Sequence, residues 1–300
     1  MTGLNYLSGR LTSWYFAARI ARKHVANWFS LLVKTLFRLD GKFVSRAGGK
    51  IACNSHLLLK QLVRLENEWQ ANGDVLPIIK FGSDTLTITN YFGRDFIVPL
   101  KSSGIASPSF FIKKYSFNVK DEIVLDIGAY LGDTPLLWLK KGAKQVIAVE
   151  PLPFHFHFLV KNTSGLPVEC LNFSVGSPIP NLPHVYGSMS YGLTATKDEV
   201  EYLPDVPCVS LIELVKSYKP TVVKLNCEGC EHFILEELAE LPSYGVKTVV
   251  VDFHDIEQMD AYSSYGHLRD KIGEGEIIYQ KVKINWLGGK SKRVTVVWNK

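Results

Sequence analysis

Apolar residues recur every three or four positions in the first part of the chain, a spacing that predicts helices. One helix is expected over residues 4–39. A second is expected along a stripe of apolar residues at 58–69, since Asn54 or Ser55 can cap its start and Gly73 can end it. The chain is therefore expected to open with a helical segment.

Two short strands are predicted after this segment. Residues 86–89 and 96–98 are β-branched or alternate between apolar and polar, and turn-forming residues lie between them. This arrangement predicts a β-hairpin. The first 120 residues thus divide into a helical part, residues 1–75, and a β-hairpin lead-in, residues 76–120.

From residue 121 the pattern changes to apolar runs that alternate with helical spacing. Strands separated by helices or loops are expected at residues 122–127, 146–149, 168–173, 222–225 and 246–253. Such alternation requires a parallel sheet with helices on both faces. The last two strands, 276–284 and 293–298, are joined by a short turn, which allows only an antiparallel hairpin. We therefore predict that residues 121–300 form a Rossmann-like α/β domain, with a mostly parallel sheet and a C-terminal antiparallel hairpin.

Composition indicates a globular protein whose positive charge lies outside this α/β domain. The 300 residues are 46% hydrophobic and 21% charged, which fits one large domain with a smaller appendage. Residues 1–50 contain nine Lys or Arg residues and one acid, a net charge of +8, whereas the whole chain carries +5, so residues 51–300 carry −3. A nucleic-acid-binding active site needs positive charge near the chemistry, so no nucleic-acid partner is expected.

The basic N-terminal segment allows two interpretations. Residues 1–50 carry the aromatic residues Trp14, Trp28 and Phe29 as well as nine cations, so they could lie on an anionic membrane surface as an amphipathic helix. Alternatively, the helix packs on its own domain and its basic face is solvated. We favour this second interpretation, because aromatic stripes at helical spacing usually belong to a core. The longest uncharged apolar-rich run, residues 24–33, is far below the ~20 residues of a membrane-spanning helix.

The cysteines indicate a reducing compartment. The chain has five of them, an odd number, and no secretory signal peptide is expected. We therefore expect a cytoplasmic protein, with peripheral membrane contact as the alternative that the basic segment leaves open. Cys227 and Cys230 form a single Cys-x-x-Cys. Because a second pair is absent, a redox or zinc site is disfavoured and no metal is expected.

A nucleotide-binding turn is predicted at the end of the first strand of the α/β domain, in the run VLDIGAYLGD. Asp126 ends the strand, Gly128 lets the backbone approach a ligand, and Gly132 lets the following helix pack near the strand. A dinucleotide fingerprint would need glycine at two further positions, which are Tyr130 and Asp133 here. A nicotinamide-dependent oxidoreductase is therefore disfavoured.

An acid at the end of the second strand completes this site. Glu150 lies 22 residues after Gly128, where a carboxylate can accept hydrogen bonds from both hydroxyls of a ribose. The acid before the turn suits S-adenosylmethionine (SAM), whose amino-acid part carries an ammonium and whose sulfonium is cationic. We therefore expect SAM as the cofactor. Besides Glu150, the candidate cofactor-binding residues in the turn are Asp126, Gly128, Ala129, Tyr130, Gly132 and Asp133.

Three stretches of the sequence together resemble the FkbM-type SAM-dependent methyltransferases. They are the turn VLDIGAYLGD with KGAK and VEPLP after it, the run ECLNFSVG, and the run VKLNCEGCE followed by VVDFH. The likeness covers about residues 78–256. It implies a class I methyltransferase sheet and methyl transfer from SAM, commonly to a hydroxyl of a small molecule or glycan. It also implies cofactor contacts from Asn172 and Phe173.

One position departs from that family. Its members usually have Asp where this chain has Asn226, and Asn cannot act as a general base and binds metal more weakly than a carboxylate. Any role of that Asp is therefore in doubt in this chain. A SAM-binding protein without catalysis, acting as a scaffold or sensor, is the alternative to an enzyme.

Methyl transfer to a hydroxyl needs a group that aligns the acceptor and takes its proton. In an open α/β sheet, ligands bind beyond the carboxyl ends of the strands. Glu228 and Glu231 follow the fourth strand, and His254 follows the fifth. We predict Glu228 as the first candidate base and His254 as the second, with Glu231 contacting the acceptor or capping a helix. Lys224, inside an apolar strand, is expected to pair with a carboxylate.

A long connection, residues 176–207, follows the third strand, and long loops in compact domains tend to be functional. We expect it to fold over the crevice and to select the acceptor. Its candidate contacts are Tyr186, Ser188, Ser190 and Tyr191. The sequence leaves the identity of the acceptor and the oligomeric state open.

Overall fold

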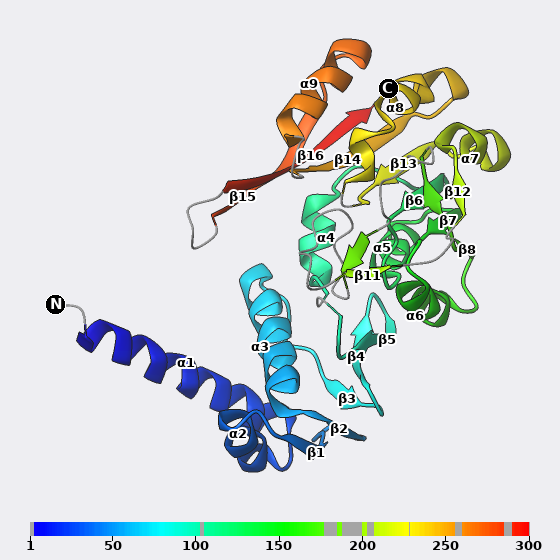
Figure 1. The fold of residues 1–300 in the computed structure, drawn as a ribbon. Helices are drawn as coiled ribbons and strands as arrows, with labels where there is room; N and C mark the ends of the chain where they lie inside the picture. Colours follow the sequence, from blue (N-terminus) through cyan, green and yellow to red (C-terminus); the bar gives the residue numbers. More distant parts are fainter. Residues whose placement is uncertain are drawn as a thin grey trace. The chain divides into compact units, whose positions relative to one another are not determined.

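The computed structural model describes residues 3–102, 105–176, 185–187, 200–202, 207–227, 229–255, 260–284 and 290–299. The chain forms two compact units, Met1–Phe111 and Ile112–Lys300. In Figure 1 the first unit runs from blue to cyan and the second from green to red. The division falls within helix α4, Pro108–Lys114. The finer division at residues 75 and 120 stays a prediction.

The N-terminal unit contains helices, a hairpin and a three-stranded antiparallel sheet. Its elements are α1 Gly3–His24, α2 Trp28–Leu36, β1 Asp40–Val44, β2 Lys50–Asn54, α3 Ser55–Asn72, β3 Ile79–Phe81, β4 Thr85–Tyr91 and β5 Arg94–Pro99. The single helix expected over residues 4–39 is wrong. The Ala26 N–H donates to the Val44 carbonyl and Val25 pairs with Ser45, so strand β1 takes the backbone groups that would continue the helix.

The second helix and the hairpin are confirmed. The Asn54 side chain caps α3 by accepting hydrogen bonds from the backbone N–H groups of His56 and Leu57. Gly73 ends the helix with a left-handed backbone, φ 75°. Strands β4 and β5 pair in antiparallel register from Thr85 opposite Pro99 onward, as the predicted hairpin requires.

A seven-stranded sheet forms the centre of the C-terminal unit. Its strands are β6 Ile123–Ile127, β7 Gln145–Val149, β8 Val168–Leu171, β13 Val222–Leu225, β14 Thr248–His254, β15 Glu276–Ile284 and β16 Lys290–Asn299, in the order β15-β16-β14-β13-β6-β7-β8. Strands β8, β7, β6, β13 and β14 are parallel, and β16 is antiparallel to both β14 and β15. The predicted α/β fold, mostly parallel with an antiparallel hairpin, is confirmed.

The helices of this unit agree with the predicted ones only in part. They are α5 Asp133–Lys140, α6 Pro153–Thr163, α7 Leu211–Tyr218, α8 Leu235–Glu240 and α9 Ala261–Ile272, with 3-10 turns η2 Cys230–His232 and η3 Leu241–Tyr244. Two small strand pairs accompany them, β9 Ser174–Val175 with β12 Cys208–Val209 and β10 Val185–Gly187 with β11 Val200–Tyr202. The sequence pattern predicts helices over residues 134–141, 154–161, 211–218 and 233–238. Helices α5, α6 and α7 agree with these bounds within two residues, α8 starts two residues later than predicted, and α9 is not among the predicted helices.

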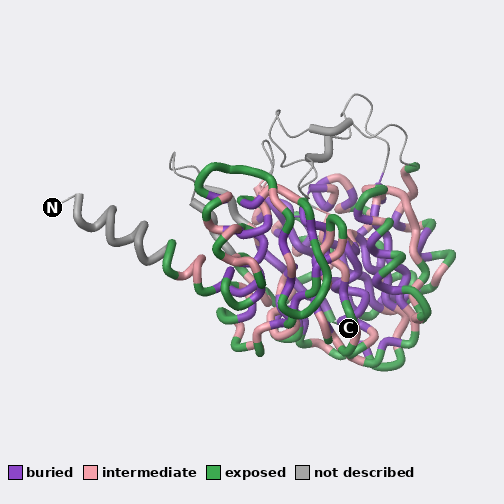
Figure 2. Tube along the Cα trace, turned by 90° about the horizontal axis from the view of Figure 1, so that it is seen from below, coloured by how far each residue is buried: buried purple, intermediate pink, exposed green. Residues whose placement is uncertain are grey.

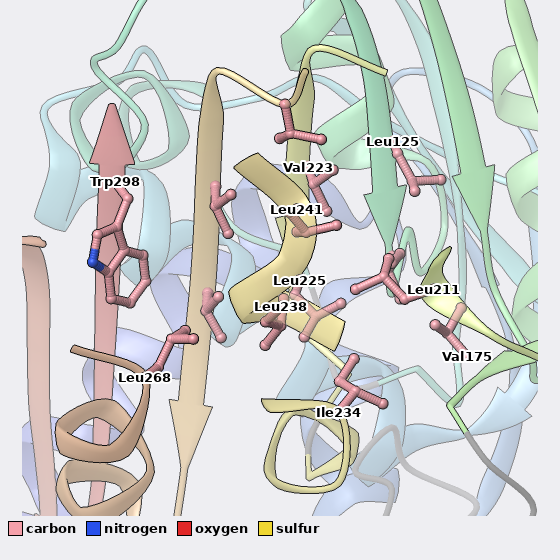
Figure 3. Packing of buried hydrophobic residues seen from close by; sticks show 14 of the residues in the cluster. Leu125, Val175, Leu211, Val223, Leu225, Ile234, Leu238, Leu241, Leu268 and Trp298 are labelled. Atoms are coloured by element: carbon pink, nitrogen blue, oxygen red, sulfur yellow. The ribbon is translucent and has the colours of Figure 1, made fainter. Parts of the chain in front are cut away.

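The two faces of the sheet differ in chemistry, because successive residues of a strand point to opposite sides. On one face, Leu125 and Val223 join an apolar core with residues of α7, α8 and α9 (Figure 3). The other face carries the buried polar side chains of Asp126, Lys224 and Asp252. Every residue of β13 and β14 is buried, and such stretches are purple in Figure 2.

The strand order reverses between β6 and β13. Along the chain, β7 and β8 lie on one side of β6, and the later strands β13 and β14 lie on the other. In open α/β sheets, ligands bind at such a switch point, beyond the carboxyl ends of the strands. The loops after β6, β7, β13 and β14 therefore define the candidate site.

Candidate active site

A buried ion pair lies directly beneath the first loop of the site. The Lys224 ammonium donates to Asp126 Oδ1 at 2.7 Å and to the Gly128 carbonyl at 2.9 Å. Trp138 Nε1 donates to the other carboxylate oxygen of Asp126 at 2.8 Å. The expectation that Lys224 pairs with a carboxylate is confirmed. Because Asp126 is completely buried and holds two protein partners, its effect on a ligand would act through the loop that it positions.

The loop after β6 is shaped by three residues with positive φ, namely Gly128 at 76°, Tyr130 at 52° and Gly132 at 99°. A Cβ on Gly128 would lie 1.9 Å from the Asn226 carbonyl oxygen, so this glycine allows close approach of the loop after β13. Its predicted contact with a ligand stays a prediction. A Cβ on Gly132 would meet α6, with Thr163 Cγ2 at 3.1 Å. Both glycines are needed, but for packing inside the protein.

Glu150 is fixed at the end of β7 by backbone groups. Its Oε2 accepts from the Tyr130 N–H at 2.9 Å and its Oε1 from the Leu152 N–H at 3.1 Å. His155 Nδ1 lies 3.5 Å from Oε1, and the His155 ring contacts the Tyr130 ring edge-on. Asn172 donates to the Glu150 carbonyl at 2.8 Å. The structure thus brings together three predicted residues, and it adds His155, which was not among the predicted site residues.

The other predicted residues of the cofactor site lie close to the same loop. The buried Ala129 donates its N–H to the Val149 carbonyl at 3.0 Å, and Phe173 is half-buried after β8. Asp133 is the first residue of α5, and its carboxylate accepts from the Thr134 N–H at 3.1 Å. Burial raises the pKa of Asp133 to about 7, with Lys224 acting in the opposite direction.

A carboxylate and an imidazole form a buried pair where β13 and β14 end. Glu231 Oε1 accepts from both the backbone N–H and Nδ1 of His254, and its Oε2 accepts from the Gly229 N–H. Although burial would raise it, the contact with His254 holds the pKa of Glu231 below its usual value, so this group is ionised. Glu231 is 0% exposed, and its predicted contact with an acceptor stays a prediction.

His232 contacts the backbone of His254 and was not predicted as a site residue. Its Nε2 lies 2.6 Å from the His254 carbonyl oxygen, which can only accept, so Nε2 carries the hydrogen. Its Nδ1 lies 2.6 Å from the Ser264 hydroxyl oxygen and, in the neutral ring, accepts from that hydroxyl. The backbone of His254 is therefore held from two sides, by Glu231 at the N–H and by His232 at the carbonyl.

A cluster of charges surrounds Asp252 on the polar face of the sheet. Lys114 and Arg293 each donate to Asp252 Oδ2 at 2.6 Å, and the Thr295 hydroxyl donates to Oδ1. Burial would raise the pKa of Asp252, but Arg293 and Lys114 hold it well below its usual range. Arg293 also reaches Asn226 Oδ1 at 3.3 Å. Asn226, which stands where FkbM-type sequences usually have Asp, therefore accepts a hydrogen bond from a cation.

Cys227 and Cys230 are joined by a disulfide. This bond was not predicted, because a single Cys-x-x-Cys pair in a reducing compartment is disfavoured as a redox site. Together with Glu231 they form a group of potential metal ligands among the described residues. While the sulfurs are bonded to each other, they offer no thiolate to a metal ion.

Several predicted residues cannot be placed. Glu228, Ser188, Ser190 and Tyr191 lie outside the described residues, and Tyr186 is described only as part of the backbone of β10. Their roles stay predictions. Within the described part of the chain, no helix combines the length and apolar character needed to cross a membrane.

No protein-family model matches this chain, and no curated protein matches its sequence. Among solved structures it resembles a precorrin-6y C5,15-methyltransferase from Geobacter metallireducens, with 12% identity over 64% of this chain and 88% of that one, and a TM-score of 0.37. It also resembles P. horikoshii TYW2, solved with MeSAdo, with 13% identity over 84% and 88% of the two chains and a TM-score of 0.39. A ribosomal protein L11 methylase from Lactobacillus delbrueckii subsp. bulgaricus gives 13% identity over 63% and 76%, and a TM-score of 0.34. At such identities and scores, we draw no conclusion about function from these structures.

Proposed function

We propose that this protein is a SAM-dependent methyltransferase. The observation that carries the proposal is Glu150, whose carboxylate is fixed by the Tyr130 and Leu152 amides at the end of β7. It lies on the strand beside the switch point, where an acid accepts the hydroxyls of a nucleoside ribose. Oε2 accepts one backbone hydrogen bond and so has a second lone pair for such a hydroxyl, whereas Oε1 also lies 3.5 Å from His155 Nδ1.

The donors and acceptors near this loop fit SAM better than a dinucleotide. The turn from β6 to α5 lacks the glycines that bring a pyrophosphate close, with Tyr130 and Asp133 in their place. The carboxylates of Asp133 and Glu150 instead suit an ammonium and a ribose. Asn172 and Phe173, at the end of β8, would border the base. When bound, SAM supplies a methyl group activated by its sulfonium.

His254 is the proton acceptor that the described residues support best. The ionised Glu231 can only accept, so His254 Nδ1 carries a hydrogen, and in the neutral ring Nε2 holds the lone pair. A nitrogen oriented in this way can take the proton of an acceptor hydroxyl as the methyl group is transferred. Glu231 then acts as a positioning residue. Glu228 remains the other candidate base from the sequence.

We propose a hydroxyl of a small molecule or glycan as the acceptor, in line with the FkbM-type resemblance. Residues 51–300 carry a net charge of −3, which disfavours a nucleic acid at this site. The long connection over residues 176–207, with Tyr186, Ser188, Ser190 and Tyr191, would select the acceptor. Deleting the tip of this connection should then change the KM for the acceptor more than the affinity for SAM.

Calorimetry of the full chain with SAM, its demethylated product and NAD tests the cofactor. We expect binding of the first two and none of NAD. Glu150→Gln should weaken SAM binding by about tenfold or more, since one hydrogen-bonded charge is lost. Glu122→Gln is the matched control, because Glu122 precedes the opposite end of β6 and contacts Thr221 and Lys247. Binding of NAD alone, or equal effects of both variants, would overturn the proposal.

A second candidate function is SAM binding without catalysis, which Asn226 and its contact with Arg293 favour. Turnover on a metabolite extract, followed as a mass gain of one methylene, separates the two functions. A methylated product supports the enzyme if the variant His254→Gln abolishes its formation but still binds SAM. No transfer with any acceptor, together with intact SAM binding and no gain in Asn226→Asp, supports the binding protein.

A further inference from the structure

Helix α2 in the N-terminal unit presents an apolar face to solvent. Leu31 and Thr35 are buried on its inner side. The outer side carries four large apolar side chains that are 39–69% exposed. Their positions, i, i+4, i+7 and i+8, share one helix face. They are Phe29, Val33, Leu36 and Phe37. We call these four residues the α2 face. Leu39, 50% exposed, continues it beyond the helix end.

Cations lie at both ends of the α2 face. The exposed Arg38 lies two residues after the last residue of α2. The exposed Lys42 lies beside the first turn, because its carbonyl accepts from the side chain of Asn27, the residue before α2. No carboxylate of the described residues forms an ion pair with Arg38 or Lys42. The one acid within residues 1–50 is Asp40, so cations greatly outnumber acids in the stretch of chain that contains α2.

We propose that the α2 face binds the surface of an anionic lipid bilayer. Aromatic and aliphatic side chains on one side of a short helix can enter the boundary between headgroups and acyl chains, while neighbouring Lys and Arg residues attract anionic headgroups. The nine residues of α2 are far too few to cross a bilayer, so the helix would lie in the surface. Charge complementarity favours this occupant over a second copy of the chain, because two copies would bring two basic surfaces together.

Co-sedimentation of the full chain with vesicles tests the proposal. We expect binding to vesicles of equal parts phosphatidylglycerol and phosphatidylcholine, and little to phosphatidylcholine alone. The triple variant Phe29→Ser/Leu36→Ser/Phe37→Ser should lower the partition coefficient about tenfold or more. Arg38→Gln/Lys42→Gln should lower the partition coefficient about fivefold for each cation removed. Added salt should also lower the partition coefficient of the unchanged chain.

The matched control is Val75→Ser/Ile78→Ser, since these residues are 92% and 59% exposed in the same unit but lie outside the α2 face. It should bind vesicles like the unchanged chain. Circular dichroism of each variant shows that the fold is kept. Absent binding to anionic vesicles, or equal binding of the triple and control variants, overturns the proposal. A dimer that the triple variant dissociates would instead assign the α2 face to a protein contact.

Discussion

Glu231 Oε1 accepts hydrogen bonds from both the backbone N–H and the Nδ1 of His254, at 2.9 and 2.8 Å, inside the protein. The carboxylate is completely buried, and the imidazole is nearly so. One oxygen therefore fixes the position of the residue and the orientation of its ring. The pair couples the loop after β13 to the end of β14.

Glu231→Gln should reduce turnover about 10–100-fold while changing SAM affinity less than about twofold, because the orientation of the base is lost but the cofactor loop is not touched. It should also destabilise the folded unit by about 1.5–3 kcal/mol at neutral pH, because hydrogen bonds to a charged acceptor are lost. The pKa of Glu231 is lowered in the fold, so its contribution to stability is present above the unfolded pKa and is lost as pH falls below about 4.5. Urea unfolding of both proteins from pH 3 to 7 should show the difference shrinking at low pH. Glu236→Gln, an exposed acid on α8, should show neither effect.

Asp133→Asn should stabilise the protein increasingly as pH rises from about 4 to 7. Burial raises the pKa of Asp133 to about 7, so over this window the native state holds a proton that the unfolded state has released. Stability contributed by this group therefore falls as pH rises. Asn keeps the acceptor for the Thr134 N–H and cannot ionise. The gain is at most on the order of 4 kcal/mol above pH 7, at about 1.4 kcal/mol for each pKa unit. Urea unfolding at pH 5 and 8 measures it, and a gain that does not change with pH would contradict the assignment.

Gly128→Ala should be far more disruptive than Gly165→Ala. Both glycines belong to the C-terminal unit, with φ of 76° and 75°, so the backbone penalty is the same, about 1–2 kcal/mol. The added Cβ meets the Asn226 carbonyl oxygen at 1.9 Å at position 128 and nothing within 4 Å at position 165. The difference in unfolding free energy between the two variants therefore reports the steric clash alone. We expect the Gly128 variant to unfold at lower urea concentration and to lose SAM affinity, and similar midpoints for the two variants would count against the close approach of the loops.

The disulfide predicts a definite thiol count. Unfolded without reductant, the chain should titrate three thiols, from Cys53, Cys170 and Cys208, and after reduction five. Five thiols without reductant would show that Cys227 and Cys230 are not bonded. Because the closed loop is short, reduction should cost about 2 kcal/mol of stability by the loop-entropy relation. Cys227→Ser/Cys230→Ser should show no response to reductant in the same unfolding measurement.

The parts of the fold that the sequence predicts well are those set by local pattern. The capped helix α3 needs only Asn54, a leucine stripe and Gly73, all within one stretch of chain. The parallel sheet follows from alternating strands and helices. The break between α1 and α2 could not be predicted, because it depends on a hydrogen bond from Ala26 to Val44, a residue 18 positions later, and no Gly or Pro marks it.

At the candidate site, the sequence predicted which residues lie at the strand ends better than it predicted which side chains they contact. Glu150 and His254 do stand at strand ends near the switch point. Asp126 was expected to face a ligand, but its partners Lys224 and Trp138 come from two other elements, and pairing across a sheet is not visible in a linear pattern. His232 was missed for the same reason, since its partners Ser264 and His254 belong to other elements. His155 lies only five residues after Glu150, at the start of α6, and this local spacing is the signal that could have found it.

The position of β16 between β14 and β15 sets an order for folding. Strands β15 and β16 are neighbours along the chain and can pair locally, whereas β16 reaches β14 only by closing a long loop, as in the contact of Thr248 with Asn299. The hairpin is therefore expected to form first and to dock as a unit. Until it docks, β14 is an unpaired sheet edge rich in valine, which another chain can extend. Weakening the hairpin should therefore promote aggregation during refolding before it lowers the stability of the finished protein.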